Sequence, residues 1–243
     1  MTRDEKRRWA YQHFIKEYLR CVAGVDENVG RILKYLDDNG LTDNTIVIYT
    51  ADQGFYLGEH GWYDKRLMYE ESLRMPLLIR YPKEIKKGTI NNDLVMNLDF
   101  APLFLDYAGM ATPSYMQGES FRKNLIGQTP ANWRKSMYYR YWMNDDGSHN
   151  VPANYGIRTE RYKLIYYYAR PLGMKEANQG NLHPEWELYD LQNDPAEMRN
   201  IYKDPAHKNL IAQLKKELLQ LKEKYGDQDS KYPEMVELNK KYW

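Results

Sequence analysis

The sequence predicts an α/β protein: part of a mostly parallel sheet flanked by helices, followed by a small four-stranded antiparallel sheet packed on a C-terminal helix. Two observations carry this prediction. Near the start, a long amphipathic segment precedes a short run rich in β-branched residues, which is the order of an αβ unit. Later, short aromatic runs alternate with turn residues, which is typical of an antiparallel sheet.

The first element is a long helix from about Asp4 to Asp38. Its apolar residues recur at three- and four-residue spacing, as expected when one face of a helix packs on a core. Asn39 and Gly40 follow directly, and both residue types favour the conformation that ends a helix. We therefore expect one continuous amphipathic helix.

Two strands and two helices are expected next. The run TIVIYT, Thr45 to Thr50, reads as a buried strand, and PLLIRYP, Pro76 to Pro82, as a second one. The segment between them begins as a glycine-rich loop and becomes helix-like from about Leu67. Asp99 is placed to cap a helix that ends at Gly109.

The pattern changes beyond about Gly127, where four short aromatic runs are separated by turns such as NDDG and NDP. These runs predict four strands: Met137 to Trp142, Asn154 to Thr159, Tyr162 to Tyr168, and Trp186 to Leu191. His207 to Lys224 then predicts an amphipathic helix, and the polar tail after Gly226 is expected to be loosely held. The change of pattern predicts two domains, residues 1–128 and residues 129–243.

Composition excludes several classes of protein. The 35 Lys and Arg residues nearly balance the 34 Asp and Glu residues, which argues against a nucleic-acid-coating protein. A single cysteine, Cys21, excludes an internal disulfide framework and a zinc site built from cysteines. No apolar run approaches the about 20 residues that span a bilayer, and no signal peptide is visible, so no membrane partner is expected.

Asp52 and Gln53 follow directly after the first predicted strand, at the carboxyl end where open α/β sheets bind ligands. A carboxylate and an amide oxygen side by side can both face a hard cation such as Ca²⁺ or Mg²⁺. An Asp two residues before a glycine is also ordinary turn chemistry, and the pair by itself leaves both interpretations open.

The loop GEHGWYDKR follows this pair and holds His60 and Lys65. An anionic substrate held by a cation needs a second positive group, and a lysine can act as that point charge. A solvated loop with a few charges is the plainer interpretation of either residue alone. The order of the two features favours an anion-binding site.

At this point the sequence resembles a known family. The segments TIVIYTADQG, LGEHGWYDKRLMYEESLRMPLLIRYP, YGIRTERYKLIYYY and WELYDLQNDPAEMRN are similar to those of the formylglycine-dependent (type I) sulfatases of the alkaline-phosphatase superfamily. The resemblance covers nearly the whole chain and implies an alkaline-phosphatase-like fold. Within that family the sequence looks most like sulfatases that act on glycans, including those that remove sulfate from O6 of glucosamine.

The resemblance implies roles for particular residues. Asp52 and Gln53 match two ligands of the active-site Ca²⁺, with Mg²⁺ as the other candidate. Lys65 matches the lysine that contacts the substrate sulfate and is the catalytic candidate, and His60 lies in the same loop as a candidate substrate contact. His149 is a candidate sugar-binding residue, as is Asn154, which stands where many relatives carry a histidine. An exposed loop histidine is the plainer interpretation of His149.

The departures from the family are also informative. Type I sulfatases oxidise the Cys or Ser of a C/S-x-P-x-R motif to formylglycine, and no segment of this chain fits that motif. We therefore expect the chain to be the C-terminal half of a sulfatase, inactive by itself, with the missing N-terminal half as its partner. If so, the helix face with Phe14, Tyr18, Val22 and Val25 should lack partners, as should one edge of the strand at Ile46 to Tyr49.

Other interpretations stay open at this stage. A phosphoester or phosphonate hydrolase of the same superfamily would share the metal geometry, and a non-catalytic glycan-binding module would share the fold. Glu70 and Arg74 are expected to form an ion pair across one helical turn. The expected substrate is a sulfated glycan, and the resemblance implies a periplasmic or secreted parent protein.

Overall fold

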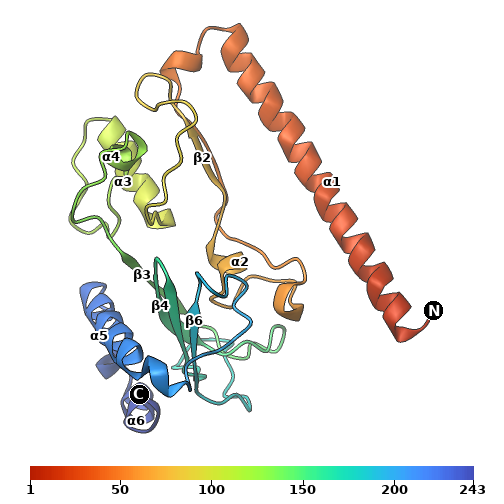
Figure 1. The fold of residues 1–243 in the computed structure, drawn as a ribbon, viewed down its shortest axis with the longest axis vertical. Coiled ribbons are helices and arrows are strands. Elements are labelled where there is room, and N and C mark those ends of the chain that lie inside the picture. Colours follow the sequence, from red (N-terminus) through yellow and green to blue (C-terminus); the bar gives the residue numbers. More distant parts are fainter. The chain divides into compact units, whose positions relative to one another are not determined.

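The computed structural model describes all residues from 1 to 243 (Figure 1). Its residues group into two compact units. The first unit comprises Met1–Asp64 and Arg74–Ile90, and the second comprises Lys65–Leu73 and Asn91–Trp243. Each unit is described by itself below. The predicted domain boundary after residue 128 stays a prediction.

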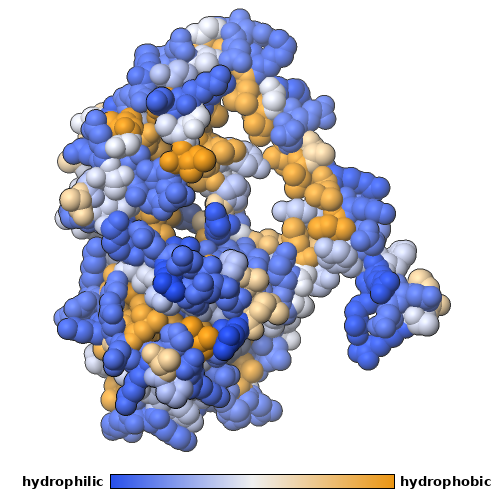
Figure 2. Space-filling view, viewed as in Figure 1, coloured by the Kyte–Doolittle hydropathy of each residue, from blue (hydrophilic) through white to orange (hydrophobic).

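The first unit begins with the predicted long helix, α1 (Arg3–Asp38). Thr2 and Glu5 form a capping box at its start, where each side chain accepts a hydrogen bond from the other residue's backbone N–H. No residue of α1 is buried, and Figure 2 shows apolar side chains in a row along it. Tyr18, Val22 and Val25 are exposed, as predicted for a face without partners. Phe14 departs from the prediction, because it is half-buried and its ring meets that of Tyr63 edge-on, with 5.1 Å between the centroids. None of the helices combines the length and apolar character that a membrane crossing requires.

The two predicted strands of the first unit are β1 (Val47–Thr50) and β2 (Leu77–Arg80). They pair with each other in antiparallel register, from Val47 opposite Arg80 to Thr50 opposite Leu77. The parallel pairing expected from the αβ order is therefore absent between these two strands. A mostly parallel sheet can carry an antiparallel edge strand, so the pairing is compatible with the predicted α/β class.

The second unit contains three short helices before its sheet: α2 (Glu70–Leu73), α3 (Phe100–Tyr107) and α4 (Arg122–Leu125). Asp99 stands at the start of α3, but its side chain makes no capping hydrogen bond there. The prediction of a cap was wrong because Asp99 already has helical dihedral angles, whereas a capping residue is usually extended. Its buried carboxylate instead accepts hydrogen bonds from the backbone of Met96 at 2.7 Å and from Arg134.

The predicted antiparallel sheet is present as four strands in sequence order. They are β3 (Ser136–Tyr141), β4 (Asn154–Thr159), β5 (Tyr162–Tyr167) and β6 (Glu185–Asp190). Each strand pairs antiparallel with its neighbour in the chain. At the turn between β4 and β5, Arg161 forms an ion pair with Asp190 of β6 at 2.7 Å.

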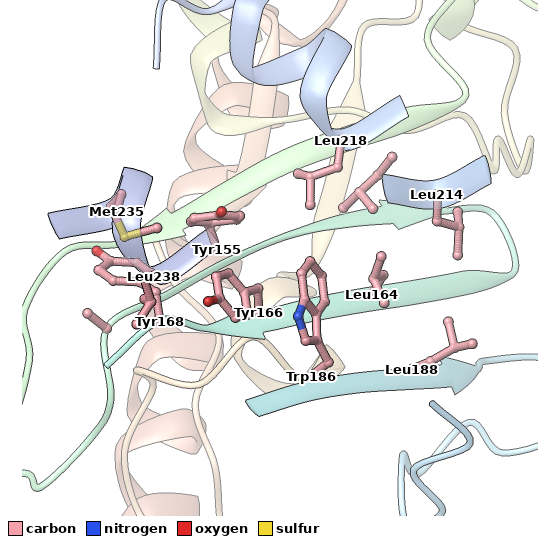
Figure 3. Close-up of a cluster of buried hydrophobic side chains, with 12 residues drawn as sticks. Tyr155, Leu164, Tyr166, Tyr168, Trp186, Leu188, Leu214, Leu218, Met235 and Leu238 are labelled. Carbon is pink, nitrogen blue, oxygen red and sulfur yellow. The ribbon is translucent and has the colours of Figure 1, made fainter. Parts of the chain in front are cut away.

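Two helices supply the other side of the core, α5 (Lys208–Lys224) and α6 (Pro233–Tyr242). Figure 3 shows their apolar side chains facing those of the sheet. The core residues share almost complete burial: Ala153, Tyr155, Ile157, Leu164, Tyr166, Tyr168, Trp186, Leu188, Leu214, Leu218, Met235 and Leu238. The expectation of a loose tail was therefore wrong, because Met235 and Leu238 give the polar tail a narrow apolar face that this core buries.

Truncation of Met235 to alanine is expected to lower the free energy of unfolding by about 2 kcal/mol, because it leaves a cavity in the core. Met235 has no exposed surface, whereas Val236 next to it on α6 is exposed and provides the matched control as Val236→Ala. Denaturant unfolding followed by circular dichroism measures both. Equal stability of the Met235→Ala variant and the wild type would mean that α6 adds nothing to the core.

Candidate functional site

Asp52 and Gln53 lie immediately after β1, as predicted. Asp52 is exposed and Gln53 is half-buried. Their oxygen donors suit a hard cation, but such ions take about six to eight ligands. No group of three or more His, Cys, Asp or Glu side chains in the chain could hold a metal ion. The pair therefore fits one part of a cation site and cannot complete it.

The loop that carries His60 is tightly folded. The backbone N–H of Tyr56 donates to the carbonyl of Asp64 at 2.7 Å, which closes the loop at its base. His60 itself has a left-handed backbone with φ of 54°, an uncommon state for a residue with a side chain. Its ring meets the buried ring of Tyr56 edge-on, with 6.1 Å between the centroids. The half-buried imidazole is therefore held in a defined place.

Lys65 opens a short segment, residues 65–73, that packs in the second unit. The side chain of Lys65 is exposed, whereas Leu67, Met68 and Tyr69 after it are buried. The hydroxyl of the fully buried Ser72 donates a hydrogen bond to the carbonyl of Lys65 at 2.5 Å. The backbone of Lys65 is thus fixed while its ammonium group faces solvent.

His149 lies on the loop between β3 and β4 and is paired with Asp146. Its Nδ1 lies 2.7 Å from a carboxylate oxygen of Asp146, and its backbone N–H donates to the other oxygen at 2.8 Å. The loop is tied to a second loop by Asn144 and Asn178, each of which donates from its side chain to a backbone carbonyl of the other loop at 2.6 Å. These contacts orient a half-buried imidazole on an ordered loop.

Asn154, the remaining predicted sugar contact, is completely buried in β4. Its side-chain nitrogen donates to the carbonyl of Pro152 at 3.0 Å. β4 is an inner strand with β3 and β5 on its two sides, which explains why side chains along it are covered. This structure does not present Asn154 to a ligand.

Of the predicted site residues, Asp52, Gln53 and His60 belong to the first unit, and Lys65, His149 and Asn154 to the second. Within the first unit the chain brings the metal pair and the His60 loop close in sequence, on one connection after β1. Within the second unit the carbonyl of Lys65 accepts a hydrogen bond from Ser72 of α2, and His149 is on a separate loop. The roles of all six stay predictions.

The sequence did not reveal a buried ionic network that includes Glu70 at the start of α2. Lys163 of β5, with no exposed surface, contacts Glu70 at 2.9 Å and Glu197 at 2.8 Å. Arg158 of β4 contacts Glu70 at 3.0 Å, and Glu197 also accepts from the backbone N–H of Glu70 at 2.6 Å. We call Glu70, Arg158, Lys163 and Glu197 the ionic network.

Helical spacing predicted that Glu70 pairs with Arg74, but both of its carboxylate oxygens contact Arg158 or Lys163. A four-residue helix gives little surface for a pair along its own axis, and the sheet offers two buried cations instead. Glu197 was missed because it lies in the turn segment NDPAEMRN, where nothing in the pattern predicts burial. Its left-handed backbone, with φ of 51°, is visible only in the structure.

The network changes the acidity of both carboxyl groups. Burial alone would raise the pKa of Glu70, but the charges of Lys163 and Arg158 outweigh it and lower the pKa from 4.5 to about 2. Burial raises the pKa of Glu197 from 4.5 to about 6, against the opposing effect of Lys163. At neutral pH the network therefore holds two carboxylates against two cations.

The lowered pKa of Glu70 predicts a pH-dependent stability. A carboxyl group with a depressed folded-state pKa stabilises the folded protein above its unfolded pKa, and this contribution is lost as the pH falls through the folded value. Between pH 4.5 and about 2 we expect the wild type to lose about 2 kcal/mol that Glu70→Gln does not lose. Urea unfolding at several pH values measures the difference.

The matched control is Glu160→Gln, because Glu160 forms only an exposed pair with Lys135 at 3.6 Å. It should follow the wild type at every pH, since exposed pairs contribute little. Parallel stability curves for the wild type and Glu70→Gln below pH 4.5 would contradict the assigned role of Glu70.

Comparison with known proteins adds two family matches. Residues 2–110 match the model described as Sulfatase, and residues 58–224 match the model described as N-sulphoglucosamine sulphohydrolase, C-terminal. The second match alone covers more than half of the chain, including Lys65 and the sheet of the second unit.

Individual proteins similar in sequence to this chain are also sulfatases. The chain is 48% identical over 234 residues to an N-acetylglucosamine-6-O-sulfatase of Bacteroides thetaiotaomicron, covering 94% of this chain and 39% of that protein. It is 29% identical to an ulvan-active sulfatase of Formosa agariphila, covering 90% of this chain and 39% of that protein. The chain thus spans about two fifths of the length of these relatives.

Solved structures are similar as well. One, in complex with its substrate D-glucosamine-2-N,6-O-disulfate, superposes with a TM-score of 0.82 at 47% identity, covering 91% of this chain and 42% of that chain. A phosphonate monoester hydrolase from Silicibacter pomeroyi superposes with a TM-score of 0.69 at 27% identity, covering 83% of this chain and 39% of that chain. The predicted α/β fold class is confirmed by these neighbours.

Proposed function

We propose that this chain, which belongs to the sulfatase family, supplies part of an enzyme that hydrolyses sulfate esters of a sulfated glycan. One observation carries the proposal: the likeness, over 91% of this chain, to a structure bound to its substrate D-glucosamine-2-N,6-O-disulfate. The identity of 48% to an N-acetylglucosamine-6-O-sulfatase supports a glucosamine sulfated on O6 as the substrate.

Each candidate residue has a distinct task in this proposal. The Lys65 ammonium offsets negative charge on the sulfate oxygens as the ester S–O bond breaks. His60 and His149, both held in defined positions, are candidate hydrogen-bonding partners of the sugar or its sulfate. Asn154 is too deeply buried to serve in the same way without movement of β4.

Asp52 and Gln53 would hold a divalent cation, and Ca²⁺ is proposed because both donors are oxygens. When bound, such a cation supplies positive charge that polarises the sulfate group. The pair contributes only two side chains, so further ligands would have to come from other parts of the full-length protein. The same holds for the nucleophile, because the chain contains no C/S-x-P-x-R motif.

The test uses the full-length protein encoded by the open reading frame that contains this chain. It is incubated with Ca²⁺ and with N-acetylglucosamine 6-O-sulfate, and ion chromatography measures released sulfate. We expect sulfate release from the 6-O ester by the full-length protein and none at comparable rates by the 243-residue chain alone. Glycan binding without sulfate release would favour a non-catalytic module and contradict the proposal.

Phosphonate or phosphate monoester hydrolysis is the second candidate, favoured by the likeness to a phosphonate monoester hydrolase. Parallel assays with an aryl sulfate and an aryl phosphonate monoester under identical conditions separate the two activities. Preference for the sulfate ester supports the first proposal. Faster turnover of the phosphonate monoester would replace it with the second.

Removal of the metal provides a separate prediction. Asp52→Asn is expected to weaken Ca²⁺ binding by at least about tenfold, because it removes the charged one of the two oxygen ligands. Titration with Ca²⁺ after treatment with a chelator, followed by sulfate release, measures this affinity. The control is Asp43→Asn, an exposed residue before β1. Unchanged Ca²⁺ dependence of Asp52→Asn would exclude Asp52 as a ligand.

The location of the parent protein is proposed from the family resemblance alone, as periplasmic or secreted. Fractionation of producing cells, followed by detection of the full-length protein, tests it. Recovery in the cytoplasmic fraction only would contradict it.

A further inference from the structure

The segment from Lys65 to Leu73 has an unusual place in the fold. In sequence it lies between β1 and β2 of the first unit, yet its residues pack in the second unit. Leu67, Met68 and Tyr69 are buried, and α2 ends the segment. Contacts with other residues of the second unit must therefore hold the segment from Lys65 to Leu73 in place.

The ionic network attaches this segment to the four-stranded sheet. Glu70 at the start of α2 forms ion pairs with Arg158 of β4 and Lys163 of β5. The carboxylate of Glu197 accepts a hydrogen bond from the backbone N–H of Glu70. Lys163 and Glu197 are both almost completely buried. Arg158 and the Glu70 backbone donate hydrogen bonds to the carboxylates, and Lys163 forms an ion pair with each carboxylate. These buried contacts restrict where α2 can lie.

Two further contacts attach the same segment to the sheet. The hydroxyl of Tyr69 donates to Glu187 of β6 at 2.9 Å, and Tyr167 of β5 donates to the same carboxylate at 3.0 Å. Met68 packs against Gly156 of β4, where an added Cβ would lie 2.6 Å from the Met68 sulfur. A glycine inside a strand often marks such a close approach.

Ser72 connects α2 to the backbone of Lys65. Ser72 lies inside α2, is fully buried, and donates from its hydroxyl to the carbonyl of Lys65. The exposed Lys65 side chain therefore extends from a backbone position that α2 and the ionic network determine.

We propose that the ionic network, acting through α2 and Ser72, positions Lys65 for the substrate sulfate. This inference rests on the proposed function of Lys65 as a sulfate contact. A lysine has a long flexible side chain, so its effectiveness as a point charge depends on how well its backbone is held. The four-stranded sheet thus contributes to the anion site without touching the anion.

The test is a double-mutant cycle in the full-length protein, with kcat/KM for the sulfate ester as the readout. Ser72→Ala alone is expected to lower kcat/KM by about tenfold, because the Lys65 backbone is released. In a Lys65→Ala background the same change is expected to have almost no effect, since no ammonium group remains to be positioned. Glu197→Gln, which weakens the network without removing volume, should behave in the same way as Ser72→Ala.

Lys135→Met is the matched control, because its pair with Glu160 is exposed and distant in sequence from the segment. It should leave kcat/KM unchanged in both backgrounds. Hydrogen–deuterium exchange of the 243-residue chain adds a readout independent of activity: amides of residues 66–73 should exchange faster in Ser72→Ala and Glu197→Gln than in the control.

The outcomes separate the inference from the function on which it rests. An active wild type in which Ser72→Ala lowers kcat/KM equally in both backgrounds would overturn the positioning role and leave the proposed function standing. Unchanged exchange at residues 66–73 would also overturn it. An inactive full-length protein would overturn both. A non-additive cycle together with faster exchange supports the inference.

Discussion

Replacement of Lys65 by alanine in the full-length protein is expected to lower kcat/KM for sulfate ester hydrolysis by about 10²–10³-fold, with little change in stability. The ammonium group is exposed, so its removal leaves no buried cavity or unpaired charge. Its positive charge would offset negative charge on the sulfate oxygens while the ester bond breaks. Steady-state kinetics with the 6-O-sulfated substrate measure the effect.

Lys65→Arg tests the geometry of the same site. It keeps the charge but replaces a compact ammonium group by a planar guanidinium group, so we expect partial activity. Lys135→Met provides the control for loss of an exposed lysine and should be fully active. Full activity of Lys65→Ala would remove Lys65 from the proposed mechanism.

Replacement of Lys163 by methionine is expected to lower the free energy of unfolding by about 3–5 kcal/mol. The variant fills the same volume, but it leaves Glu70 and Glu197 buried with only Arg158 to balance them. Removal of one partner from a buried ionic cluster costs more than the cluster contributes as a whole, because the remaining charges stay without compensation.

Denaturant unfolding of the 243-residue chain at neutral pH measures this loss. Lys135→Met should unfold like the wild type. The double variant Lys163→Met with Glu197→Gln should recover part of the stability, since it removes one of the two uncompensated carboxylates. A change below about 1 kcal/mol in Lys163→Met would mean that the ionic network does not hold the second unit together.

Local pattern predicted most of the secondary structure correctly. The four strands of the second unit were predicted within one residue of their observed bounds, because aromatic runs and turn residues mark both of their ends. α1 and α5 were predicted equally well from their apolar spacing. These elements are encoded by residues that are neighbours in the sequence.

The errors share a different cause. The role of Asp99, whose carboxylate accepts from Glu119 and Arg134, and the order of the C-terminal tail both depend on partners far along the chain. The tail offers only Met235 and Leu238 as buried apolar residues, and such a short pattern cannot be distinguished from a polar linker. A single-sequence pattern carries no information about which distant surface receives such residues.

The residues of the candidate site also differ in whether the sequence alone could predict them. The sequence by itself determined the family, and it predicted Asp52, Gln53, His60 and Lys65 as site residues, because they lie in short segments that resemble the sulfatases. It also proposed Asn154, which the structure buries in an inner strand.

Only the tertiary structure decided how Lys65 is held. The ionic network joins residues that are far apart in the chain: the hydrogen bond between Glu70 and Glu197 spans 127 residues. No periodicity links them, and each alone resembles an ordinary surface charge. The role of these four residues depends on burial, because the fold brings their charges together away from solvent. The resulting network connects the segment that begins at Lys65 to the four-stranded sheet.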